Sequence, residues 1–291
     1  MRADPREYEL VTPADLRSVL TLMDREPGIW TPIAGGTDLM VLYSAGKLRA
    51  RKLVSIWKLQ ELRGIEIGSN EIRIGAACTY SDLRQHQVVS RELPLLVTAA
   101  SWTGGIANQN RGTLGGNIVN ASPAADSLPA LLVYEATLDL VSARGEREVP
   151  YIQFHRGYKE HALETGELIR AIRIPRKYSG YFSYTQKVGA RRAQAISKVC
   201  IAALARLENG MITDARIALG SVAPVPVRLM ETERVLIGKK KERGLSGVAA
   251  SSVAAQICPI DDLRSDASYR SAVAANLVAE FVQNLCSQAG S

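Results

Sequence analysis

The sequence is poor in features that mark several common classes of protein. Aromatic residues make up 5% of its 291 positions, and no apolar run approaches the ~20 residues that a membrane-spanning helix needs. The first residues, 1–8, lack the apolar stretch of a secretory signal peptide. We therefore expect a cytoplasmic protein that does not span a membrane.

Cysteine is also scarce. The four cysteines lie far apart, at Cys78, Cys200, Cys258 and Cys286. No C-x-x-C pair exists, so an iron–sulfur cluster held by this chain is not expected, and neither is a disulfide framework. The histidines show no spacing typical of metal ligands. We expect no metal on this chain.

Three motifs of well-known enzyme classes are missing. No two glycines lie two positions apart, so the G-x-G-x-x-G fingerprint of Rossmann dinucleotide folds is absent. The chain also lacks the G-x-x-x-x-G-K-[ST] loop of many ATPases and the G-x-S-x-G elbow of many hydrolases. No general acid or base stands out, and we predict no catalytic residue of that kind.

The net charge of +7 raises the question of nucleic-acid binding. Basic clusters occur at Arg191-Arg192 and Lys239-Lys240-Lys241, among others. A nucleic-acid surface combines such charges with interleaved aromatic side chains, and aromatics are few here. We therefore expect solvated faces, or a docking surface for acidic partners, and no nucleic acid.

Paired glycines beside a threonine occur twice, at Gly35-Gly36-Thr37 and at Thr113-Leu114-Gly115-Gly116. Adjacent glycines allow positive φ and let a ligand approach where a Cβ would block it. Amides freed by such turns can converge on an anion, and a threonine hydroxyl adds a donor. One such pair is more often a plain turn. Two with matching threonines predict anion-binding loops, and two such loops facing each other could hold both phosphates of one pyrophosphate.

The sequence pattern alone does not decide the roles of two charged residues, Asp126 and Lys187. Asp126 follows the second motif, where it could accept hydrogen bonds from a ribose or adenine, or could cap the helix that begins nearby. For Lys187, the residues alone favour a solvated side chain, which is the usual state of a lysine.

Hydrophobic patterns predict the surrounding elements. Thr12 and Pro13 predict a helix start, a strand over 30–34 leads into the first glycine motif, and a helix or turn follows over 39–43. Alternation predicts a hairpin over 65–74 and another turning at Asn209-Gly210, with arms over 199–207 and 215–219. Alanine-rich helices are expected near 245–257 and 269–286. The pattern is that of an α+β protein, with a boundary around 176–180.

The two motifs closely resemble those of the FAD-binding subunit of the xanthine dehydrogenase family, the molybdenum hydroxylases. The matching stretches are residues 34–39, 110–118 and 121–126, and the resemblance extends over essentially the whole chain. It implies a two-lobed FAD-binding domain of the PCMH type over residues 1–178. A small C-terminal domain, an antiparallel sheet with helices, follows over residues 179–291.

The resemblance also implies which residues contact FAD. It places Asp126 at the nucleotide end and Lys187 and Ile169 at the flavin ring. The full set of implied FAD contacts is Ile33, Ala34, Gly35, Gly36, Thr37, Asp38, Leu39, Thr113, Gly115, Gly116, Asn117, Ala121, Asp126, Ile169 and Lys187. Residues 102–108 depart from the pattern expected before the second motif, so the resemblance does not assign which side chains of this stretch flank the flavin ring.

The implied function is electron transfer within an oxidoreductase complex. A molybdenum large subunit with molybdopterin would oxidise the substrate, and an iron–sulfur small subunit with two [2Fe–2S] clusters would relay electrons to FAD on this chain. NAD⁺ or another acceptor would then reoxidise the flavin. The expected assembly is a dimer of heterotrimers. Two alternatives remain: a self-sufficient flavoenzyme with a related FAD fold, and a scaffold subunit that has lost its flavin.

Overall fold

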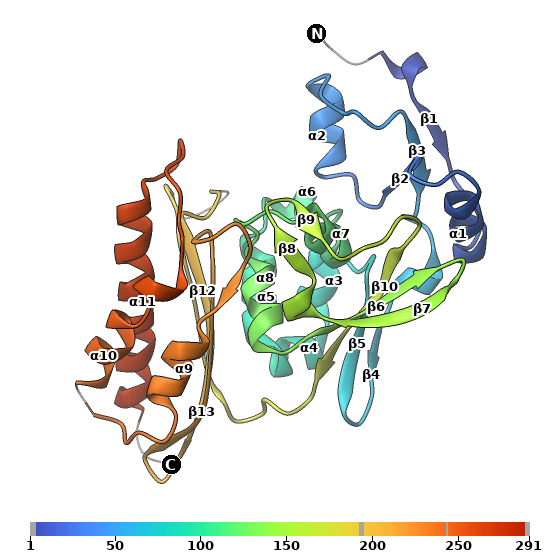
Figure 1. Cartoon of the computed structure of the whole chain (residues 1–291). Helices are drawn as coiled ribbons and strands as arrows, with labels where there is room; N and C mark the ends of the chain where they lie inside the picture. The colour runs from blue at the N-terminus through green and yellow to red at the C-terminus, as the bar shows by residue number, and fades with distance from the viewer. Residues whose placement is uncertain (1–3, 192–194, 243, 289–291) are drawn as a thin grey trace.

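The computed structural model describes residues 4–191, 195–242 and 244–288. Its architecture is α+β, as the sequence predicts. Figure 1 shows the N-terminal three-stranded sheet at one side, a central body of helices beside a five-stranded sheet, and the C-terminal sheet with its helices at the other side.

The N-terminal lobe is a parallel sheet in the order β1 (Glu9–Val11), β3 (Lys52–Ser55) and β2 (Trp30–Ile33). Helix α1 (Leu16–Arg25) packs its apolar stripe against this sheet. The helix starts after Asp15, whose side chain accepts a hydrogen bond from the Ser18 amide at 2.7 Å. The predicted start at Thr12 is therefore wrong, because Asp15 is the capping residue. Helix α2 (Leu39–Ser44) follows the first glycine motif.

The second lobe contains an antiparallel sheet in the order β4-β5-β10-β6-β7. Its strands are β4 (Ile65–Ile67), β5 (Glu71–Gly75), β10 (Leu168–Pro175), β6 (Thr137–Ser142) and β7 (Gly145–Pro150). The predicted hairpin over 65–74 is present as the β4–β5 pair. A small two-stranded ribbon, β8 (His155–Gly157) and β9 (Glu160–His161), leads back toward β10.

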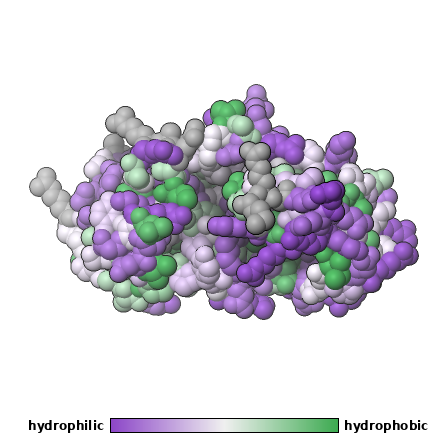
Figure 2. Space-filling model, turned by 90° about the horizontal axis from the view of Figure 1, so that it is seen from above, coloured by the Kyte–Doolittle hydropathy of each residue, from purple (hydrophilic) through white to green (hydrophobic). Residues whose placement is uncertain are grey.

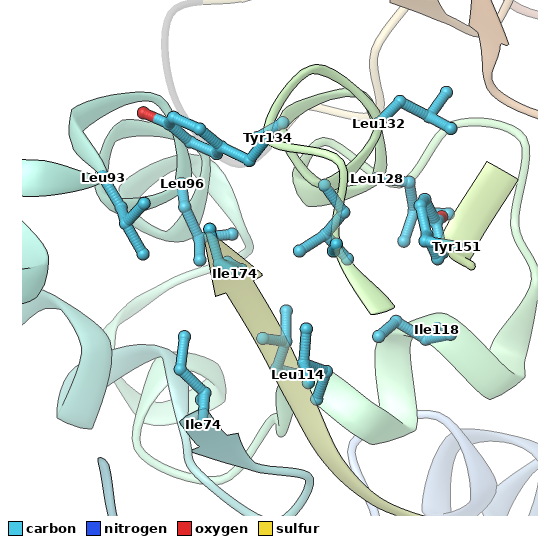
Figure 3. Close-up of a cluster of buried hydrophobic side chains, with 14 of the residues drawn as sticks. Ile74, Leu93, Leu96, Leu114, Ile118, Leu128, Leu132, Tyr134, Tyr151 and Ile174 are labelled. Atoms are coloured by element: carbon cyan, nitrogen blue, oxygen red, sulfur yellow. The ribbon is translucent and has the colours of Figure 1, made fainter. Parts of the chain in front are cut away.

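Six helices lie in the chain between β5 and β6, around the second glycine motif. They are α3 (Tyr80–Gln85), α4 (Gln87–Glu92), α5 (Pro94–Trp102), α6 (Ile106–Gln109), α7 (Leu114–Asn120) and α8 (Ser127–Val133). Figure 3 shows Leu114 and Ile118 of α7 in the same buried cluster as Ile74 and Ile174 of the sheet. Residues four apart on a helix share a face, so this pair anchors α7 and leaves its glycines on another side.

The C-terminal sheet has the order β11-β12-β13-β14 and is antiparallel. Its strands are β11 (Phe182–Val188), β12 (Val199–Glu208), β13 (Met211–Gly220) and β14 (Val227–Arg228). Helices α9 (Met230–Leu236), α10 (Leu245–Ser251) and α11 (Ala267–Ser287) cover one face (Figure 1). Helix α8 packs against the other face and is buried along its whole length, as an apolar helix between two layers should be.

Two predictions for this region had different outcomes. The hairpin turn at Asn209-Gly210 is confirmed, and both residues have positive φ, 52° and 75°. The helix over 245–257 is wrong in length, because α10 ends at Ser251 and a short 3₁₀ turn follows at Ala254–Gln256. The hydroxyls of Ser251 and Ser252 bond back to carbonyls of this helix, a competition that weakens helices near such residues.

Candidate cofactor site between two glycine-rich loops

A cavity of about 690 Å³ lies between the two glycine motifs. Most of the residues predicted to bind a cofactor line it. They are Ala34, Gly35, Gly36, Thr37, Asp38, Leu39, Thr113, Gly115, Gly116, Asn117 and Ile169. Segments more than a hundred positions apart in sequence thus meet at one site.

The first motif is an open loop with free donors. Gly36 has φ of +76°, which only glycine adopts readily. The backbone N–H groups of residues 35–39 donate to no acceptor within the described part of the chain. The loop runs from the end of β2 into the start of α2, where helix geometry also leaves amides unpaired. These amides can bind an anion in the cavity.

The second motif is different from the prediction, because its glycines belong to the first turn of helix α7. The amides of Leu114, Gly115 and Gly116 donate to Cys78 O, Ala76 O and Thr113 Oγ1, at 3.0, 2.9 and 3.1 Å. Gly115 and Gly116 do not have positive φ. The idea that both loops offer a nest of free amides is therefore wrong, since this helix end is already satisfied by the protein.

Glycine is needed in the second motif for close approach. A Cβ on Gly115 would lie 2.7 Å from both Cβ and O of Ala76, and a Cβ on Gly116 would lie 2.8 Å from Thr113 Oγ1. Both distances are shorter than ordinary contacts of a Cβ. Gly115 thus lets α7 lie against the residue that follows β5, in one wall of the cavity, and Gly116 makes room for the Thr113 hydroxyl.

Arg111 joins the two motifs. A Cβ on Gly35 would lie 1.5 Å from the Arg111 carbonyl oxygen, so the two backbones touch. The Arg111 guanidinium stacks on the Trp57 ring, 4.0 Å from its centroid, and its Nε donates to Gly35 O at 3.3 Å. Trp57 follows β3 of the N-terminal lobe, so Arg111 couples the second lobe to the first.

Asp126 and Lys187 form a buried ion pair outside the cavity wall. Lys187 Nζ donates to Asp126 Oδ2 at 2.6 Å, and their side chains are 12% and 7% exposed. Ser197 also donates to Asp126. Burial raises the pKa of Asp126, and the charge of Lys187 opposes that rise.

This pair corrects the placement that the sequence suggested for each member. Asp126 was expected at one end of the cofactor and Lys187 at the other, yet the two carry one salt bridge. They are therefore neighbours and cannot lie at opposite ends of a cofactor. The plain reading of Asp126 as a helix cap is also wrong, because its side chain makes no cap hydrogen bond to α8.

Two further predicted residues, Ile33 and Ala121, are not part of the cavity wall. Ile33 ends strand β2 just before the first glycine motif. Ala121 ends α7 in the left-handed conformation, with φ of 48°, and is buried. Both support the backbone of a motif.

Among the described residues, no helix is long and apolar enough to cross a membrane. The same part of the chain contains no group of histidine, cysteine, aspartate or glutamate side chains placed to hold a metal ion.

Comparison with known proteins identifies this architecture. A family model described as the FAD-binding domain in molybdopterin dehydrogenase matches residues 6–177. A second model, the C-terminal domain of CO dehydrogenase flavoproteins, matches residues 184–285. The chain belongs to the FAD-binding subunits of the molybdenum hydroxylase family. It is thus an oxidoreductase subunit, as the resemblance implied.

Curated relatives of this flavin subunit match over most of their length. The xanthine dehydrogenase FAD-binding subunit of Escherichia coli O157:H7 is 32% identical over 264 residues, covering 89% of each chain. The glyceraldehyde dehydrogenase medium chain of Sulfolobus acidocaldarius is 33% identical, covering 91% of this chain and 94% of the relative. A solved carbon monoxide dehydrogenase from Hydrogenophaga pseudoflava has a TM-score of 0.91 at 29% identity, with 96% of each chain covered.

The residues present fit FAD. The first loop supplies free amides for a diphosphate, and the contact between Gly35 and Arg111 leaves no room for side chains between the two motifs. Apolar residues in the cavity wall, Trp30 and Ile56 among them, suit a flat aromatic base.

Several residues of the flavin subunit's cavity were not predicted from sequence. Tyr80 and Thr103 line it near the second motif, and residues 163–168 line it from the approach to β10. His161 also lies in the wall and stacks on Phe154, with ring centroids 5.6 Å apart. Its buried Nδ1 has no hydrogen-bond partner in the part of the chain that the structure describes. No motif marks these positions, because each reaches the cavity only through the packing of its own segment.

Proposed function

We propose that this flavin subunit holds FAD in the cavity between its glycine motifs and passes electrons within a molybdenum hydroxylase complex. The electrons would come from [2Fe–2S] clusters of an iron–sulfur small subunit and go on to NAD⁺ or another acceptor. FAD, when bound, supplies the redox chemistry, and the protein supplies position and electrostatics. The observation that carries the proposal is the row of unpaired amides over residues 35–39, which faces the wall formed by α7.

The proposed roles of individual residues follow from their positions. The amides of residues 35–39 bind the diphosphate, and Ile169, 4% exposed on β10, gives an apolar contact for the ring. Lys187 lies 3.5 Å from the carbonyl oxygen of Trp102, next to Thr103 in the cavity wall. Its positive charge would favour the reduced form of a flavin ring bound on the Thr103 side of the cavity. We accordingly propose that Asp126 belongs to the ring end as well.

We also propose the partners and the organisation of the chain. The relatives include medium chains of carbon monoxide dehydrogenases, which supports an iron–sulfur small subunit, a molybdenum large subunit and a dimer of such heterotrimers. Figure 2 shows apolar residues as separate spots among hydrophilic ones on the face seen from above, so a partner docking there would meet a mixed surface. The two family matches lie on either side of the proposed boundary at residues 178 and 179. A cytoplasmic location stays a prediction from the sequence.

The deciding experiment is the absorption spectrum of the purified chain before and after heat release of any cofactor, with mass analysis of the released compound. We expect two visible flavin bands and FAD at about one per chain. A folded, colourless chain that does not take up added FAD would contradict the proposal and favour a scaffold subunit.

One observation keeps a second candidate open, a self-sufficient flavoenzyme. Related oxidases often tether their flavin through a histidine, and His161 lies in the cavity wall although it is distant from the glycine motifs in sequence. Flavin that stays on the denatured chain, or bleaching of the isolated chain by a substrate, would favour this candidate. We expect neither.

A further inference from the structure

One side of the cavity is formed by a short segment, residues 162–167, which connects β9 to β10 and is called the strap below. Residues 163–167 of the strap line the cavity, and the start of β10 continues that wall. In the described part of the chain, the hydrogen bonds that join residues 163–167 to other segments come from two arginines of the β6–β7 hairpin, Arg144 and Arg147. The shape of this wall therefore depends on the neighbouring hairpin.

The strap folds into a turn over residues 164–167. The Glu167 amide donates to Glu164 O at 3.1 Å, and Gly166 has φ of +86°, which glycine adopts readily. The Glu167 carboxylate closes the same turn from the other direction, because its Oε2 accepts from the Glu164 amide at 2.7 Å. The carboxylate is thus placed inside the turn, and its residue is only 8% exposed.

Arg147 of β7 supplies the partner that this buried carboxylate needs. Its Nε and Nη2 donate to Glu167 Oε1 and Oε2 at 2.6 and 2.7 Å, a fork that also fixes the orientation of the carboxylate. The same Nη2 donates to Ala162 O at 2.8 Å. Hydrogen bonds from Arg147 lower the pKa of Glu167 below its usual range, although burial opposes them. The pair therefore stays ionised and ties both ends of the strap to β7.

We propose that Arg147 and Glu167 are positioning residues for FAD, because their ion pair holds the strap in the shape that lines the cavity before the cofactor arrives. Arg147 is not among the described residues that line the cavity, so it acts through the strap. A segment that is ordered beforehand costs less to immobilise on binding. The inference rests on the proposed function and concerns residues outside both glycine motifs.

The test uses two variants of the full chain and a control. R147L leaves the buried Glu167 carboxylate without its partner, whereas the double variant R147L/E167L removes both charges and so avoids an unpaired buried charge. R144L is the matched control, because Arg144 reaches the same strap only through exposed contacts, to Thr165 O at 3.4 Å and to Glu164 at 3.7 Å. Each protein is melted without cofactor and titrated with FAD, and its visible circular dichroism is recorded at saturating FAD.

We expect the Kd for FAD to rise about five- to twentyfold in R147L and in the double variant, since the strap must then be ordered on binding. R144L should bind FAD like wild type. The double variant should melt closer to wild type than R147L does and yet bind FAD no better, because its strap still lacks the tie. The circular dichroism of the bound flavin should change in both, because the wall around the cofactor is altered.

Hydrogen exchange of the apoproteins tests the tie without FAD. Amides of residues 163–167 should exchange faster in the double variant than in wild type, and those of the C-terminal sheet should not.

The inference would be overturned if the double variant bound FAD like wild type, or if the spectrum of the bound flavin were unchanged in both variants, because the pair would then serve folding alone. An effect of R144L as large as that of R147L would also overturn it, since charge near the strap would then be the cause. Failure of the wild-type chain to bind FAD would instead contradict the proposed function, whereas unchanged exchange in the strap would contradict the tie itself, so the two failures are distinguishable.

Discussion

At the residue scale, the glycines of the two motifs serve different physical needs. Gly36 is required for its positive φ, whereas Gly115 has an ordinary helical conformation. Gly115 is required because α7 lies against Ala76, with the Gly115 amide bonded to Ala76 O at 2.9 Å. The same residue type thus answers a conformational demand in one loop and a steric demand in the other.

We predict that G115A lowers the free energy of unfolding by about 1–2 kcal/mol, because a methyl group in that contact overpacks it. Displacement of α7 should also weaken FAD binding tenfold or more. The matched control is G247A, since Gly247 lies in α10 with nothing within 4 Å of an added Cβ. Alanine there should stabilise the helix by up to about 1 kcal/mol. Urea unfolding and FAD titration of both variants check this, and equal stability would contradict it.

At the scale of elements, the distance between the two motifs is set by a contact outside the cavity. Arg111 reaches from the start of the second motif to the Trp57 ring. Arg63 also lies over that ring, 4.4 Å from its centroid, and donates to Trp57 O. The Nε bond from Arg111 to Gly35 O adds a direct tie to the first loop. Such stacking contributes about 0.5–2 kcal/mol.

We predict that R111L and W57L each raise the Kd for FAD about five- to tenfold, because the first loop then loses its support against the second. The apoproteins should stay folded, since the lobes also share a buried apolar cluster. K58L, which removes one exposed positive charge beside Trp57, is the matched control and should bind FAD like wild type. FAD titration at two salt concentrations measures all three.

The pair of variants separates two roles of Arg111. If R111L weakens binding but W57L does not, the effect is one of charge toward the diphosphate, and the proposed stacking tie is contradicted.

At the scale of the whole molecule, Glu135 links the second lobe to the C-terminal sheet. It follows α8 and pairs with Lys177 at 2.7 Å, with Arg216 of β13, and with Arg228 of β14 at 3.4 Å. Burial by itself raises the pKa of Glu135, but hydrogen bonds from Lys177 and Arg216 outweigh it and bring the pKa to about 2. The carboxylate is thus held ionised by cations from both sides of the junction.

We predict that E135Q is less stable than wild type by about 1–2 kcal/mol near neutral pH, a value kept small because the site is partly exposed. A depressed pKa in the folded state means that this stability is fully present above the unfolded pKa of about 4.3. It is lost as the pH falls from there toward about 2. Melting temperatures of both proteins across this range should therefore converge on acidification.

The control for this prediction is E231Q, which removes an exposed pair with Arg234 on the surface of α9. Its melting temperature should follow wild type at every pH. A constant gap between E135Q and wild type down to pH 2 would mean that the charge of Glu135 is not the cause.

The sequence by itself determined the features that depend on neighbouring residues. The turn at Asn209-Gly210 and the first glycine motif at the end of β2 follow from local sterics, and alternation correctly predicted the β4–β5 hairpin. The long second motif identified the family, and hence FAD as the cofactor. Gly36 and Thr113, which the resemblance implied as FAD contacts, both line the cavity.

Only the tertiary structure decided which backbone and side-chain groups are already paired within the protein and which are available to a cofactor. The amides of the second motif are occupied because α7 packs on Cys78 and Ala76, which lie far earlier in the chain. The pairing of Asp126 with Lys187 depends on how the C-terminal sheet meets α8. Tyr80 lies in the cavity wall beside Gly112, to whose carbonyl oxygen its amide donates. Such contacts join segments tens of positions apart, and they arise from the packing of whole elements, which no local pattern of residues encodes.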